Sequence, residues 1–209
     1  MNNSCYRLGD LIIQNLDETI KSRILKEYPN SFGSKYIIEK ENNGYFNNID
    51  IITEIVLQGI EEYKHLLPND IENSTVVHLR IGDVVSGNAW FEQVKKPLDV
   101  EYYNIVPTNK KIYVIGKCHF GDECSQNYEE SIDNSNKYLS EIIKLLNAKH
   151  FDSGNADIDL CCAVKSKLFI QGRGFYSKLI VEIRKKLNLE NIETEVFDLD
   201  LQHKLGIFF

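Results

Sequence analysis

The sequence predicts an α/β protein in which a parallel sheet is flanked by helices. Short apolar runs, typical of buried strands, alternate along the chain with segments whose apolar residues recur at helical spacing. Three of these runs end in a glycine turn, as strands of βαβ units commonly do. Together these observations favour Rossmann-type parallel sheets over an all-helical or all-β fold.

Length and composition exclude several classes of protein. The 209 residues are 43% hydrophobic and 26% charged, which is enough to bury a core and excludes a disordered chain. No apolar run reaches the roughly 18 residues that cross a bilayer, so we expect no integral membrane segment. The net charge of −7 disfavours nucleic acid as a partner. The five cysteines and the absence of a secretion signal at the N-terminus predict a reduced, cytoplasmic location.

The elements are predicted from periodicity. Apolar residues at helical spacing predict helices over residues 11–20, 47–63 and 139–146, and a fourth helix after the 172–174 turn with Leu179, Ile183 and Leu187 facing inward. Short β-branched or apolar runs predict five strands, over residues 36–38, 75–79, 112–115, 168–170 and 195–197. A long loop is expected between the second and third of these strands.

Glycine turns follow three of the strands. They occupy residues 78–83, 115–117 and 171–178, and they are expected to lie together because ligands bind outside the carboxyl ends of parallel strands. Glycine lets the backbone approach a ligand, and the helix that follows offers free N–H groups to an anion. The turns therefore predict a phosphate pocket, although each glycine can also simply end a strand. Its expected residues are Gly116, Gly172, Arg173, Gly174, Ser177 and Lys178.

The segment that follows the 75–79 strand carries a histidine and an arginine. His78 and Arg80 are two residues apart, so both side chains are expected on one face. A bidentate arginine beside a histidine suits a diphosphate. In the alternative, Arg80 forms an ion pair with Asp83 that only braces the turn.

Several segments resemble one enzyme family in the expected order. His78-Leu79-Arg80-Ile81-Gly82-Asp83 resembles the His-x-Arg-Arg-x-Asp block of the GDP-fucose-dependent fucosyltransferases, particularly the α-1,2-fucosyltransferase type, with Ile81 in place of the second arginine. Arg7-Leu8-Gly9-Asp10 resembles the family's opening glycine turn, and Tyr102-Tyr103 resembles its paired tyrosines. The 157–162 segment, followed by residues 168–170 and 172–177, resembles a later block of the same family.

The resemblance implies a fold and an activity. The fold would be a compact GT-B-like arrangement, with an acceptor-side lobe at residues 1–70 and a nucleotide-sugar-binding lobe at residues 71–209. The activity would be an inverting, metal-independent glycosyl transfer, with fucose moving from GDP-fucose to a carbohydrate hydroxyl and no cofactor. The partners would be the nucleotide-sugar donor and the carbohydrate acceptor.

The resemblance also implies roles for individual residues. Arg80 would hold the donor's pyrophosphate with His78 beside it, and the 172–177 turn would close over the phosphates. Asp157 or Asp159 would accept hydrogen bonds from guanine. Gly9 belongs to the opening turn. Asp10 and Asp83 are the candidate catalytic bases, because each stands beside a glycine turn.

Other interpretations are weighed against this one. Asp157 and Asp159 have the Asp-x-Asp spacing of a metal site, but their place ahead of a helix favours nucleoside contact or helix capping. The cysteines fit no zinc pattern, so no metal is expected. Two other functions remain open: a transferase of the polysaccharide pyruvyl type, and a non-catalytic module that binds nucleotide sugars or glycans.

Overall fold

The chain forms an α/β fold around a five-stranded parallel sheet, as the sequence predicts. The structure, a computed structural model, describes residues 18–19, 22, 49–82, 84–85, 97–118 and 128–194. The strands follow the order β3-β2-β1-β4-β5, and all are parallel. Their bounds are β1 Thr75–His78, β2 Ile112–Ile115, β3 Lys149–His150, β4 Leu168–Ile170 and β5 Glu190–Ile192.

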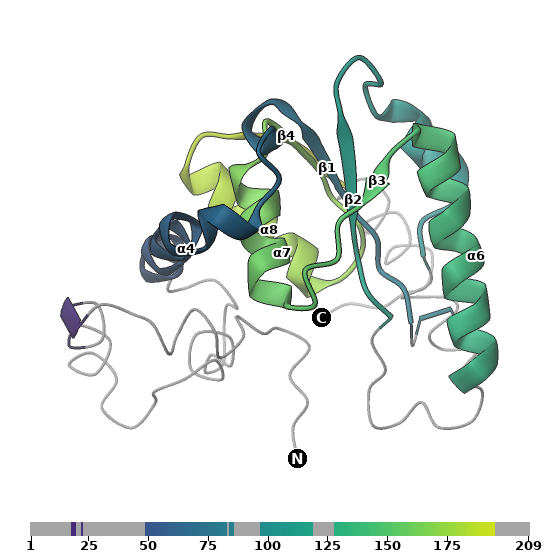
Figure 1. The fold of residues 1–209 in the computed structure, drawn as a ribbon, viewed down its shortest axis with the longest axis horizontal. Helices are drawn as coiled ribbons and strands as arrows, with labels where there is room; N and C mark the ends of the chain where they lie inside the picture. The colour runs from purple at the N-terminus through teal and green to yellow at the C-terminus, as the bar shows by residue number, and fades with distance from the viewer. Residues whose placement is uncertain are drawn as a thin grey trace, which may run out of the picture.

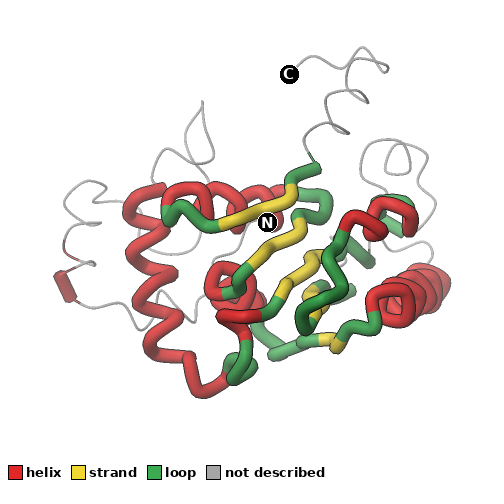
Figure 2. The backbone as a smooth tube through the Cα atoms, turned by 90° about the horizontal axis from the view of Figure 1, so that it is seen from above, coloured by secondary structure: helices red, strands yellow, loops and turns green. Residues whose placement is uncertain are grey.

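Helices cover both faces of the sheet (Figure 1). One face carries α4 (Ile49–Tyr63), α7 (Ala156–Lys165) and α8 (Phe175–Lys186), which pack against one another. The other face carries α6 (Tyr128–Leu146) and the 3-10 helix η3 (Val100–Ile105). Seen from above, the strands run between these two layers (Figure 2). Two short 3-10 helices, η1 (Lys64–Leu66) and η2 (Ile71–Asn73), lead from α4 to β1.

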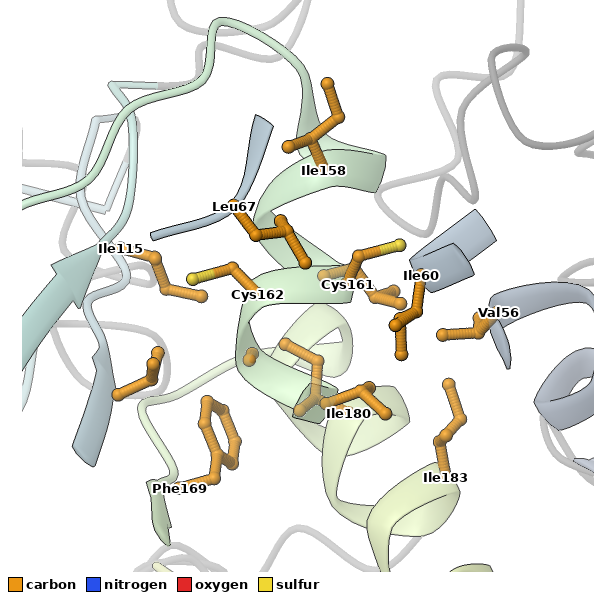
Figure 3. Packing of buried hydrophobic residues seen from close by; sticks show 14 of the residues in the cluster. Val56, Ile60, Leu67, Ile115, Ile158, Cys161, Cys162, Phe169, Ile180 and Ile183 are labelled. Atoms are coloured by element: carbon orange, nitrogen blue, oxygen red, sulfur yellow. The ribbon is translucent and has the colours of Figure 1, made fainter. Parts of the chain in front are cut away.

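The adjacent cysteines belong to the core between α4, α7 and α8 (Figure 3). Cys161 and Cys162 are both fully buried and lie in one cluster with Ile60 and Ile180. Burial raises the pKa of the Cys161 thiol to about 12, and the pKa of Cys162 also rises through burial. Both side chains therefore act as small apolar groups in the interior, and neither has the thiolate character of a nucleophile.

The second core lies under α6 and η3. Val77 and Val114 on the sheet pack in one cluster with Ile142 of α6 and Tyr103 of η3. All four side chains are buried, so η3 packs on this face of the sheet together with α6. The predicted loop between β1 and β2 thus contains an ordered 3-10 helix that positions Tyr103.

Several elements differ from the sequence predictions. The edge strands β3 and β5 were not predicted, and α6 begins at Tyr128, eleven residues before the first apolar residue of the predicted helix, Leu139. The predicted strands 36–38 and 195–197, and most of the predicted helix 11–20, lie outside the described residues. None of the helices that the structure describes combines the length and apolar character needed to cross a membrane.

The domain expectation placed the first seventy residues in a lobe of their own. In the structure α4 packs against α7 and α8, and its buried residues share a core with them. The part of the first lobe that is described from residue 49 onward therefore belongs to the layer of helices on the sheet.

The strand order places a topological switch point beside β1. The chain passes from β1 outward to β2 and β3, and then returns through α7 to β4 on the opposite side of β1. This is the order of doubly wound nucleotide-binding sheets, in which ligands bind outside the carboxyl ends where the connections diverge. In this chain the connections diverge between β1 and β4.

Candidate functional site

The turn after β4 is shaped by its contact with His78. Val77 pairs with Ile170, so His78 lies beside the residues that follow β4. A Cβ on Gly172 would lie 2.2 Å from the backbone oxygen of His78 and 2.8 Å from its Nδ1 atom. Gly172 therefore has to be glycine for the two segments to approach this closely.

Helix α8 begins in this turn with an open N-terminus. Gly174 precedes the helix with φ of 91°, a conformation that favours glycine, and it has no side chain with which to cap the helix. The first intrahelical bond runs from Lys178 N–H to Gly174 O at 3.2 Å. The N–H groups of residues 175–177 precede this bond, so they point out of the helix end, where anions bind.

Arg80 lies against the same helix end. A Cβ on Gly174 would lie 3.5 Å from Cδ and 3.8 Å from Nε of Arg80. The arginine side chain is half-buried and Gly174 is exposed, so this point after β1 and β4 is accessible to solvent. The structure thus brings Arg80, from the β1 segment, to the turn after β4. The guanidinium offers hydrogen-bond donors in a fixed geometry, and the helix N-terminus offers backbone N–H groups. Together they suit the oxygens of a phosphate group.

His78 is a neutral, buried neighbour of this arrangement. The side chain is 6% exposed, and burial together with the charge of Arg80 lowers its pKa to about 3. Its Nδ1 atom is buried and has no hydrogen-bond partner among the described residues. At neutral pH the imidazole is uncharged, so the positive charge at this point comes from Arg80 and the helix end.

Arg173 and Ser177 take other positions than the sequence suggested. Arg173 is only 8% exposed and lies near Tyr103 and Tyr138. Burial raises the pKa of both tyrosines, to about 12 for Tyr138, while the charge of Arg173 opposes both shifts. Ser177 is fully buried, and its Oγ accepts a 2.9 Å bond from Gly172 N–H, so it closes the turn.

Two further predicted residues, Gly116 and Lys178, lie in this region, and packing explains the first of them. Gly116 ends β2 with φ of 146°, and a Cβ there would lie 2.5 Å from the backbone oxygen of Leu79. Close packing between two strands therefore explains this glycine. Lys178 is exposed on the second turn of α8. Its charge is available near the helix start.

The two aspartates predicted to contact guanine lie in the first turn of α7 and take part in hydrogen bonds there. Asp159 Oδ1 accepts bonds from the Ser153 hydroxyl at 2.6 Å and from the Ser153 N–H at 3.2 Å. Burial raises the pKa of Asp159. Asp157 is fully buried, and its N–H donates to the capping side chain of Asn155 at 2.8 Å. This geometry favours the helix-capping interpretation of the segment.

Some predicted positions cannot be placed. Gly9, Asp10 and Asp83 lie outside the described residues. Within the part of the chain that is described, no three His, Cys, Asp or Glu side chains are arranged to hold a metal ion. An open hollow of about 430 Å³ lies between η3 and α6, and it is lined by carboxylates and by neither Arg80 nor His78. Its charge does not suit a diphosphate.

Sequence reasoning missed two residues of α8, one at this site and one near the other end of the helix. Tyr176, in the first turn of α8, contacts His78, and Arg184 is fully buried on the same helix. A tyrosine beside a glycine turn is a weak signal. For Arg184 the signal is its place four residues after the apolar Ile180, which puts the two side chains on one face of the helix.

The fold and the site define a parallel α/β protein in which an arginine and the N-terminus of a helix lie together where the connections after β1 and β4 diverge. Comparison of the chain with protein-family models, curated proteins and solved structures found no match.

Proposed function

We propose that this protein binds the diphosphate of a nucleotide sugar between β1 and β4 and transfers the sugar to a carbohydrate hydroxyl. The expected donor is GDP-fucose, and the expected architecture is of the GT-B type. One observation carries the proposal: the side chain of Arg80 lies beside Gly174, the residue that precedes α8, and the neutral His78 lies nearby against Gly172. This combination offers charge, bidentate donors and backbone N–H groups to one anion.

The chemistry follows from where charge develops. The acceptor hydroxyl oxygen attacks the anomeric carbon while the bond from that carbon to the diphosphate oxygen breaks. The hydroxyl proton passes to a base, for which Asp10 and Asp83 are the candidates from the sequence. Negative charge builds on the leaving diphosphate, and Arg80 and the helix N–H groups stabilise it there.

The choice of GDP over other nucleotides depends on the resemblance of residues 157–162. Oδ1 of Asp159 already accepts two hydrogen bonds from Ser153, so a guanine base would have to donate to the second carboxylate oxygen. A comparison of nucleotides is therefore the first test of this proposal.

A thermal-shift screen would use GDP, UDP, CDP and dTDP, their sugars, and phosphoenolpyruvate. A ligand at 100 times its Kd stabilises the folded protein by about 2.7 kcal/mol, which moves the melting temperature measurably. We expect GDP and GDP-fucose to stabilise. Stabilisation by phosphoenolpyruvate alone would favour pyruvyl transfer, and no stabilisation by any of them would contradict the proposal. Slow donor hydrolysis without acceptor would distinguish an enzyme from a binding module.

A further inference from the structure

Tyr176 connects three segments that surround the proposed diphosphate site. Its ring lies against the imidazole of His78, with 5.4 Å between ring centroids and 47° between the planes. Its hydroxyl donates a 2.6 Å hydrogen bond to the backbone oxygen of Ala156, the first residue of α7. One side chain in the first turn of α8 thus contacts the end of β1 and the start of α7.

These contacts position the imidazole of His78 and the first turn of α8. The imidazole of His78 has Gly172 beside its Nδ1 atom and Tyr176 against its ring, so loss of the tyrosine ring opens space beside it. The hydroxyl bond joins the first turn of α8 to the first turn of α7. Position matters here because donors aimed at a developing charge lose their effect when they are misplaced by about 1 Å.

We propose that Tyr176 is a positioning residue for the diphosphate: its ring seats His78 and its hydroxyl holds the first turn of α8 in the orientation that receives the anion. This inference rests on the proposed function, because it assumes that the site takes a diphosphate. Tyr176 does not itself need to touch the ligand. Its effect passes through the imidazole and through the N–H groups of residues 175–177.

Two variants separate the ring from the hydroxyl, and a third is a matched control. Tyr176→Met removes both the ring contact and the hydroxyl bond, and methionine keeps a high helix propensity. Tyr176→Phe removes only the hydroxyl bond. The control is Tyr138→Phe, since the Tyr138 hydroxyl also donates a 2.6 Å bond to a backbone oxygen, that of Leu98, along with a 3.2 Å bond to Tyr103. No contact joins Tyr138 to His78 among the interactions described.

The measurements are the affinity for inorganic pyrophosphate and for GDP by calorimetry, and the pH titration of the His78 imidazole signals by NMR. We expect Tyr176→Met to weaken pyrophosphate binding by about tenfold or more, and Tyr176→Phe by about threefold. The imidazole should stay neutral down to pH 5 in the wild type, and its pKa should rise toward 6.5 in the methionine variant only. Tyr138→Phe should bind as the wild type does.

Each result has one meaning. If the wild type binds pyrophosphate and Tyr176→Met binds it equally well, the positioning role is wrong while the proposed function stands. An equal loss of affinity in Tyr138→Phe would show general destabilisation and would also overturn it. If the wild type binds neither pyrophosphate nor any nucleotide, the proposed function fails and this inference with it. If Tyr176→Met does not fold, the threefold loss in Tyr176→Phe, against none in Tyr138→Phe, decides the question.

Discussion

Arg184 Nη1 donates a 2.8 Å hydrogen bond to the backbone oxygen of Ala163, which joins α8 to the end of α7. The same nitrogen donates to the oxygens of Val164 and Ser166 at 2.8 and 2.9 Å, and Nη2 donates to Glu190 O at 2.8 Å. Arg184 therefore satisfies carbonyls at the C-terminus of α7 and at the start of β5 although it is fully buried. Burial lowers its pKa to about 10, so it remains charged at neutral pH.

The first prediction concerns this buried arginine. Arg184→Met keeps much of the side-chain volume but leaves several buried carbonyls without donors. We expect a loss of about 3–5 kcal/mol in the free energy of unfolding, measured by urea denaturation. A matched change on the surface of the same helix, Lys186→Met, should cost less than about 1 kcal/mol, because the Lys186–Asp50 ion pair is exposed. Equal stability of the two variants would show that the Arg184 bonds contribute little.

The second prediction concerns the contact between Gly172 and His78. Gly172→Ala places a methyl group on the backbone oxygen and the imidazole of His78, so the turn after β4 must move away. We expect destabilisation of about 1–3 kcal/mol and loss of measurable pyrophosphate binding. Gly172 is not among the glycines with positive φ, so its cost comes from this contact; Gly154→Ala, with φ of 76° and open space around its Cβ position, shows the cost of backbone strain without a contact. Retained binding in Gly172→Ala would contradict the role given to this turn.

The third prediction concerns pH. The folded protein holds His78 neutral with a pKa of about 3, against 6.5 in the unfolded chain. Below about pH 6.5 the unfolded chain therefore binds a proton that the folded chain does not, and stability falls as pH decreases. The contribution approaches ~1.4 kcal/mol per pH unit between about pH 6 and pH 4. Arg80 is the charged group that adds to this shift.

The comparison that isolates His78 uses His78→Gln, which lacks the titrating group. Chemical denaturation at several pH values should show a shallower loss of stability in the variant across this range. Carboxylates with raised pKa values, such as Asp159, are present in both proteins and cancel in the difference. Identical pH dependence would mean that His78 titrates normally in the folded protein.

The fourth prediction concerns metal ions. Arg80 and the N-terminus of α8 can supply the positive charge that a divalent cation supplies to diphosphates in other enzymes. Transfer from the donor should therefore persist in excess EDTA. Activity that disappears with chelator and returns with Mn²⁺ would assign the charge to a metal instead.

The parallel sheet was predictable because its three central strands are buried on both faces. β1, β2 and β4 consist of buried residues, so they appear in the sequence as short apolar runs. The edge strand β3 has two exposed residues, Lys149 and His150, and gives no such signal. The first half of α6 is also polar, and it contacts the segment after β1 through Ser135, whose Oγ accepts a bond from Gly82 N–H.

The part of the candidate site that depends only on where the strands end could be predicted from the sequence. Arg80 and Gly174 meet because the carboxyl ends of neighbouring parallel strands share one edge, a rule that needs no side-chain detail. The burial of Arg173 and the closure of the turn by Ser177 depend on how the turn bends after Gly172. Glycine allows many backbone conformations, so the sequence does not predict in which direction such a turn bends. The positions of Arg173 and Ser177 could therefore be found only from the structure.

In the proposed function, Arg80 binds the diphosphate with two parallel hydrogen bonds that strengthen as the leaving group gains charge. Arg80→Lys keeps the charge and removes the fork, so the most direct test is the rate of transfer from GDP-fucose by this variant, with its melting temperature measured alongside. We predict a rate at least about 10²-fold lower with little change in melting temperature. Transfer at nearly the wild-type rate by Arg80→Lys would contradict the account.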